Sequence, residues 1–188
     1  MKKPSHSLLV SVLLVMVVQG PAAMAANPEA DATRAFREGR WQDAHALLVP
    51  LATNGNPRAQ TQLGLLYYHG DGVTQDLLQA FNLFYAAATQ GDREAQYHLG
   101  NLYLYHHDIP LVDNEDPDRT GAMWIIDSAT RGFPEAQYTL GLLLLAGTGV
   151  RLDPSEGIVW IRKAASGGHQ RAAAFFGEFI GDRQRTGE

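Results

Sequence analysis

The residues best suited to binding a metal ion gather near the middle of the chain. Their carboxylates would supply oxygen ligands for Ca²⁺, and their imidazoles would supply nitrogen ligands for a transition metal. The set is His106, His107, Asp108, Asp113, Asn114, Glu115, Asp116 and Asp118. An EF-hand loop needs a glycine and a distal glutamate at fixed positions, and this segment lacks both. We therefore predict no metal site and no cofactor, and interpret His106, His107, Asp113 and Glu115 as candidates for contact with a partner.

Nucleophilic catalysis is the second chemistry to consider. The chain has no cysteine, which excludes thiol catalysis, disulfides and a lipid-modified cysteine. Beyond residue 25 the serines are Ser128, Ser155 and Ser166, and none is followed three residues later by lysine, as the serine of a β-lactam-acting enzyme would be. We therefore predict that the protein is not an enzyme. A periplasmic enzyme that acts on β-lactams or peptidoglycan is the alternative from another class.

The elements that would position these side chains repeat along the chain. Three units span residues 56–91, 92–132 and 133–168, with 36, 41 and 36 residues. Small and apolar residues recur in each unit at spacings of three, four and seven, which is the period of a helix. In the first halves the recurring residues are Ala59, Leu63, Gly64 and Leu66; Ala95, Leu99, Gly100 and Leu102; and Ala136, Leu140, Gly141 and Leu143. In the second halves they are Ala80, Phe84 and Ala87; Gly121, Ile125 and Ser128; and Gly157, Ile161 and Ala164.

Start and stop signals agree with this period, so each unit is predicted to be a hairpin of two helices. A side-chain cap followed by proline opens helices at residues 56–57, 116–117 and 153–154. Glycine, which tolerates the left-handed conformation, closes the second helices at Gly91, Gly132 and Gly168. Residues 26–55 fit a shorter first hairpin, and residues 169–188 fit a capping helix with a polar tail.

These repeated residues resemble the pattern of a known family. Leucine-glycine pairs, the turns at residues 70–73 and 147–150, and the alanine pairs of the second helices are similar to Sel-one-like repeats, relatives of the tetratricopeptide repeats. The resemblance extends over most of residues 31–181. It implies an all-α, right-handed α/α solenoid of helix hairpins that serves as an adaptor or scaffold. The middle unit departs from the pattern at residues 106–109 and has five added residues, so its turn is expected to be rebuilt.

The first twenty-five residues are typical of a secretory signal. Lys2 and Lys3 precede an apolar stretch at residues 8–18, and cleavage is expected after Ala25. That stretch is shorter than the roughly 20 residues of a membrane-spanning helix, so we expect an exported, periplasmic or secreted protein without an integral membrane segment. Without residues 1–25 the formal charge changes from −5 to −7. Nucleic acid is therefore an unfavourable partner.

The first helices of the hairpins are apolar on more than one side. Opposite the predicted core stripe lie Leu65, Tyr68, Tyr97, Asn101, Leu104, Tyr138, Leu142 and Leu145. Such helices are either buried on all sides or line a binding groove. We predict that these residues form a concave surface that binds a protein or peptide, with the second helices as the solvated outer wall. A structural subunit of an envelope assembly is a further alternative that the sequence leaves open.

Overall fold

The computed structural model describes residues 27–106 and 116–177, and its elements are helices joined by short turns. The helices are α1 (Pro28–Arg37), α2 (Trp41–Thr53), α3 (Pro57–His69), α4 (Leu77–Thr89), α5 (Arg93–Tyr105), α6 (Pro117–Thr130), α7 (Pro134–Ala146) and α8 (Pro154–Ser166). A further helical segment begins at Gln170. No strand occurs in the described part of the chain. The all-helical prediction is therefore confirmed.

The predicted helix ends are present. The side chain of Asn56 accepts a hydrogen bond from the backbone N–H of Ala59 at 2.9 Å, and Asp116 and Asp153 cap α6 and α8 in the same way. The glycine after each of α4, α6 and α8 has a positive φ, with values of 89° at Gly91, 81° at Gly132 and 92° at Gly168. Local sequence therefore determines where each helix begins and ends.

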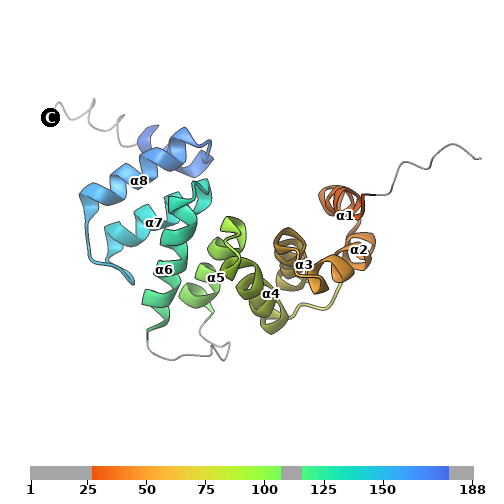
Figure 1. The fold of residues 1–188 in the computed structure, drawn as a ribbon. Coiled ribbons are helices and arrows are strands. Elements are labelled where there is room, and N and C mark those ends of the chain that lie inside the picture. Colours follow the sequence, from red (N-terminus) through yellow and green to blue (C-terminus); the bar gives the residue numbers. More distant parts are fainter. Residues whose placement is uncertain (1–26, 107–115, 178–188) are drawn as a thin grey trace, which may run out of the picture.

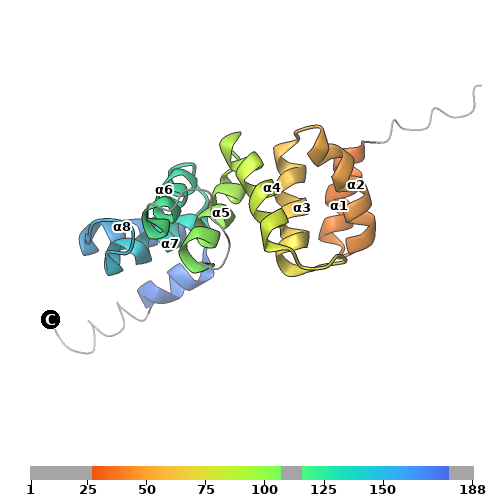
Figure 2. The same ribbon diagram turned by 90° about the horizontal axis from the view of Figure 1, so that it is seen from below.

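The hairpins stack in chain order. Figures 1 and 2 show them following one another along a curved row from α1 to α8. Each helix packs mainly against the helices before and after it in the sequence. The core forms a series of clusters between adjacent helices, with Leu48, Phe84, Leu99 and Ile125 almost fully buried. These clusters combine residues of adjacent hairpins, which is the physical reason for a solenoid.

Glycine lets the two helices of a hairpin approach closely. A Cβ atom added to Gly100 would lie 2.9 Å from the carbonyl oxygen of Gly121, and one added to Gly121 would lie 2.8 Å from that of Gly100. Gly141 and Gly157 form the same pair between α7 and α8. The recurring glycines of the first helices therefore stand where the second helix leaves no room for a side chain.

A row of glutamine hydrogen bonds joins each hairpin to the previous one. The amide of Gln60 donates to the carbonyl oxygen of Ala52 at 3.1 Å, Gln96 donates to Ala88 at 3.2 Å, and Gln137 donates to Ala129 at 3.2 Å. Each glutamine follows the repeated alanine of a first helix. The bonds of Gln60 and Gln96 are buried and that of Gln137 is partly buried, so they restrict how far one hairpin can slide on the next, because an unpaired buried carbonyl would be costly.

Several predictions from the sequence lie outside the described residues. The signal segment with its cleavage site, most of the rebuilt turn of the middle unit, and the polar tail all belong to this group. Among the helices that the structure describes, none has both the length and the apolar character that a membrane crossing requires.

Candidate functional site

An open pocket crosses successive first helices of the solenoid. Its volume is about 390 Å³, and its lining comes from α3, α5, α7 and the start of the segment after α8. The lining residues are Tyr68, Tyr97, Asn101, Tyr105, His106, Glu135, Tyr138, Thr139, Leu142, His169 and Arg171. We call this feature the tyrosine groove. Because it spans several repeats, it depends on the stacking of hairpins and on no single helix.

Five residues that the sequence placed on the concave surface line the groove together: Tyr68, Tyr97, Asn101, Tyr138 and Leu142. Leu142 is 38% exposed, and the three tyrosines and Asn101 are half-buried. Leu65 and Leu145 are also half-buried, but they pack against neighbouring core clusters. Neither leucine is part of the groove lining.

Leu104 requires a correction. It is only 5% exposed and belongs to the core cluster that contains Ala122 and Ile125. The reason is Gly121 on α6: a Cβ atom there would lie 2.7 Å from Cγ of Leu104, so α6 closes directly over this leucine. Leu104 stabilises the α5–α6 hairpin and is not available to a partner.

His106 is the one predicted turn residue that the structure describes. Its Nε2 atom lies 3.2 Å from the hydroxyl oxygen of Tyr68, and the two rings meet edge to face at 5.8 Å between centroids. This contact joins the end of α5 to the end of α3. The other three turn candidates, His107, Asp113 and Glu115, lie outside the described residues.

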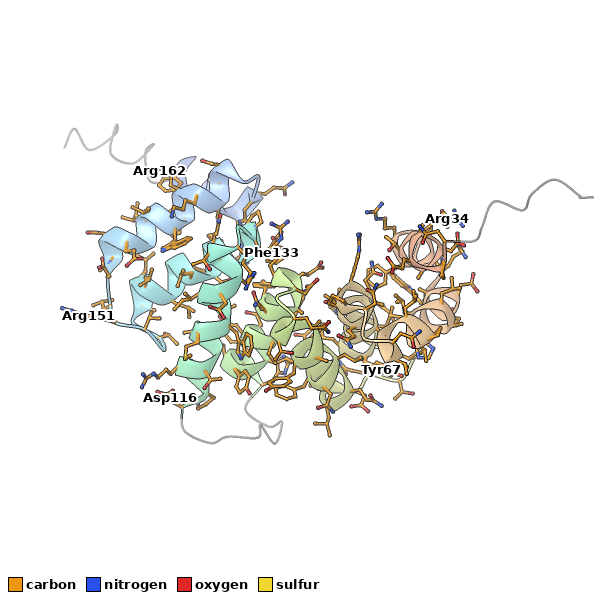
Figure 3. All side chains as sticks on the ribbon, viewed as in Figure 1. Arg34, Tyr67, Asp116, Phe133, Arg151 and Arg162 are labelled. Carbon is orange, nitrogen blue, oxygen red and sulfur yellow. The ribbon has the colours of Figure 1, made fainter. Side chains whose placement is uncertain are left out.

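Packing of the rings orients the tyrosines of the groove. The ring of Tyr97 lies 5.3 Å from that of Phe133, which Figure 3 labels at the amino end of α7. The ring of Tyr138 stacks on His169 at 4.5 Å, and the guanidinium carbon of Arg171 lies 5.6 Å from the same ring. Neighbouring hairpins therefore hold these rings in place before any ligand arrives, which lowers the entropy cost of binding.

The structure adds groove residues that the sequence reasoning did not select: Tyr105, Glu135, Thr139, His169 and Arg171. Glu135 and Arg171 each stand directly before the repeated alanine of their unit, a position that the repeat comparison could have marked. His169 and Arg171 belong to the next unit along the chain. Their place beside Tyr138 depends on how successive hairpins stack, which the sequence alone does not determine.

The serine considered for catalysis in the middle unit has a structural role. Ser128 is fully buried, and its hydroxyl donates a 2.6 Å hydrogen bond to the carbonyl oxygen of Arg93. Across residues 27–106 and 116–177, no three side chains of the metal-binding types gather in one place.

The groove itself offers ring faces, an apolar edge, an amide and two charged groups, which are contacts for recognition.

His98 beside the groove gives a prediction about pH. Its ring stacks on Phe84 at 5.2 Å, and burial, followed by the charge of His69, lowers the pKa of His98 to about 4. In the unfolded chain the imidazole has a pKa near 6.5. The unfolded state therefore gains a proton first as the pH falls from about 6.5 to about 4, and stability decreases over that window.

We expect a loss of about 1–3 kcal/mol across this window, allowing for the solvent that a half-buried side chain retains. Urea unfolding at pH 7 and pH 4.5 would measure it. His98→Gln is the matched control, because Gln62 occupies the equivalent position of the first unit. Equal pH dependence in the two proteins would contradict the assignment to His98.

Comparison with known proteins places these features in a family. The Sel1 repeat model matches residues 57–92, 93–125 and 134–169. An exopolysaccharide production negative regulator of Rhizobium leguminosarum bv. viciae is 30% identical over 162 residues, which are 81% of this chain and 61% of that protein. The chain therefore spans less than two thirds of that curated relative.

Solved structures agree with this match. The crystal structure of a Sel1 repeat protein from Oxalobacter formigenes superposes with a TM-score of 0.71 at 27% identity, covering 82% of this chain and 59% of that one. A protective antigen of uropathogenic Escherichia coli with an SLR fold gives a TM-score of 0.66 at 30% identity, covering 80% and 33%. With three matched repeats over more than half of its length, the chain belongs to the Sel1 repeat family.

Proposed function

We propose that this protein is a non-catalytic, exported interaction module of the bacterial cell envelope, and that the tyrosine groove binds a peptide or an extended protein segment. The observation that carries the proposal is the groove itself, in which Tyr68, Tyr97 and Tyr138 from three successive hairpins line one pocket. Tyrosine is frequent among the residues that dominate binding energy at protein interfaces.

The relatives support the non-catalytic part of the proposal. The similar protein of Rhizobium leguminosarum is named as a negative regulator, which describes a regulatory role and not an enzymatic one. The apolar leader at residues 8–18 supports export. A helical solenoid also suits this role because its stacked hairpins offer a long continuous surface.

The groove can be tested with a double variant, Tyr97→Ala with Tyr138→Ala. If each ring contributes about 2 kcal/mol, affinity for the partner should fall by a factor of about 1,000. The measurement is quantitative capture from an envelope extract with the chain lacking residues 1–25, followed by calorimetric titration with the purified partner. Tyr85→Ala is the matched control, because Tyr85 is 48% exposed on the outer helix α4.

A second groove variant separates binding from folding. Leu142→Asp changes an exposed side chain at the groove edge, so the helical circular dichroism signal should remain while capture is lost. Undiminished capture by both groove variants would contradict the proposed site. Turnover of a reporter β-lactam or of purified peptidoglycan by the wild-type protein would contradict the non-catalytic assignment.

Export has its own test. Expression of the full chain in a Gram-negative host should yield periplasmic protein whose amino terminus is Ala26. Edman sequencing of the periplasmic fraction would measure this. Uncleaved protein confined to the cytoplasm would show that residues 1–25 do not direct export.

A further inference from the structure

A row of charged residues runs along the amino ends of the first helices. Arg58, Glu94, Glu135 and Arg171 each stand directly before the repeated alanine of their unit, and all four are exposed. Equivalent positions in stacked hairpins lie side by side, so the row is positive at its ends and negative at its centre. We call it the charge row.

The charges of this row lack ion-pair partners in the described part of the chain. The ion pairs found there join Arg34 to Asp31 and Arg40 to Glu38 and Asp43, all within α1, α2 and the turn between them. Arg93, next to Glu94, is occupied elsewhere: its guanidinium donates to the carbonyl oxygen of Arg131 at 3.3 Å and lies 6.0 Å from the ring of Phe133.

The two central carboxylates influence each other through space. The pKa of Glu94 is raised, first by partial desolvation and then by the carboxylate of Asp92, with Glu135 adding to the increase. Arg58 and Arg93 act in the opposite direction. Two carboxylates without ion-pair partners, next to a pocket, favour a ligand with a positive charge.

The tyrosine groove lies directly beside the charge row. Glu135 and Arg171 line it, and Tyr97 and Tyr138 follow Glu94 and Glu135 by three residues, which places each ring on the same helix face as its carboxylate. Aromatic faces attract lysine and arginine side chains within about 6 Å of the ring centre. The ring of Tyr138 already has Arg171 at 5.6 Å, so the two carboxylates and the ring of Tyr97 favour a cation at the centre of the row.

Building on the proposed function, we propose that the segment bound in the groove carries a lysine or arginine that sits between Glu94 and Glu135 beside the ring of Tyr97. Its positive charge is followed by an acidic side chain that reaches Arg171. Arg171 belongs to the repeat after that of Glu135, so the basic and acidic residues stand at separate positions of the same bound segment.

A positional-scanning library of nine-residue peptides tests this pattern, with peptides retained by the immobilised protein read by mass spectrometry. We expect lysine and arginine to be enriched about tenfold or more over glutamate at one position, with an acidic preference at a separate position of the same peptide. The variant Glu94→Gln with Glu135→Gln should remove the basic preference. Glu94→Lys with Glu135→Lys should reverse it. Glu94→Asp with Glu135→Asp should keep it.

Asp127→Asn is the matched control, because Asp127 is an exposed carboxylate on the outer helix α6 and its loss should leave the preference unchanged. Peptides whose retention depends on Tyr97 and Tyr138 but shows no basic preference would overturn this inference and leave the proposed function intact. If no peptide is retained through Tyr97 and Tyr138, or if neutral dextran oligosaccharides are retained and peptides are not, both this inference and the proposed function would be overturned.

Discussion

Replacing Phe84 with alanine is expected to lower the free energy of unfolding by about 3–5 kcal/mol, the usual cost of removing a buried phenylalanine. The ring is fully buried, and it contacts the backbone of α3 at Gly64 and the ring of His98 on α5. Its removal leaves a cavity where three helices meet. Hydrogen bonds from Gln90 to Gln60 and from Gln96 to Ala88 link α4 to α3 and α5, and they oppose the shift that would close this cavity.

Chemical denaturation of the wild-type and variant chains would measure this loss. The matched control is Phe84→Ile, since Ile125 and Ile161 occupy the equivalent positions of the other units. Isoleucine should cost clearly less than alanine because it fills most of the space. Equal losses for both variants would contradict a cavity as the cause.

Replacing Gly100 with valine is expected to destabilise the protein by at least about 2 kcal/mol, through overpacking and not through lost contacts. Even its Cβ atom would lie 2.8 Å from Cδ1 of Ile125 and 2.9 Å from the carbonyl oxygen of Gly121. The side chain of Ile125 could rotate, but the backbone of α6 cannot move without separating the hairpin. Thermal unfolding followed by circular dichroism would measure the effect.

Gly177 provides the control, because it holds the equivalent position in the last unit and a Cβ atom there would meet no described atom within 4 Å. Gly177→Ala should leave stability unchanged or raise it by up to about 1 kcal/mol, since alanine favours a helix more than glycine does. A loss at Gly177 as large as the loss at Gly100 would show that the cost is not steric.

The fold could be predicted from the sequence because its determinants are local. Caps such as Asn56 and Asp153 act on the next turn of the same helix, and the recurrence of residues such as Leu63 and Leu99 marks the buried face of each unit. The hydrogen bond of Gln96 could not be predicted, because it depends on how far one hairpin is offset from the previous one.

The candidate site was predictable only in part. The half-buried positions of Tyr97 and Tyr138 follow from the helical period, and the structure brings both to one groove. Leu104 fits the same helical period, but it packs against Gly121. The close approach of α6 at this glycine buries the leucine. Arg171 reaches the groove from the following unit, a relation that appears only when the hairpins are stacked.

The chain-order packing of the helices also affects the mechanics of the molecule. Because each described helix rests mainly on its sequence neighbours, no interface among residues 27–106 and 116–177 ties the first hairpin to the last. Tension applied between the two ends would detach outer hairpins one after another, and amide exchange would be fastest at the two ends of the row and slowest near Leu99 and Leu102. The tyrosine groove, which extends into the last unit, would therefore be dismantled early while the central hairpins stay folded.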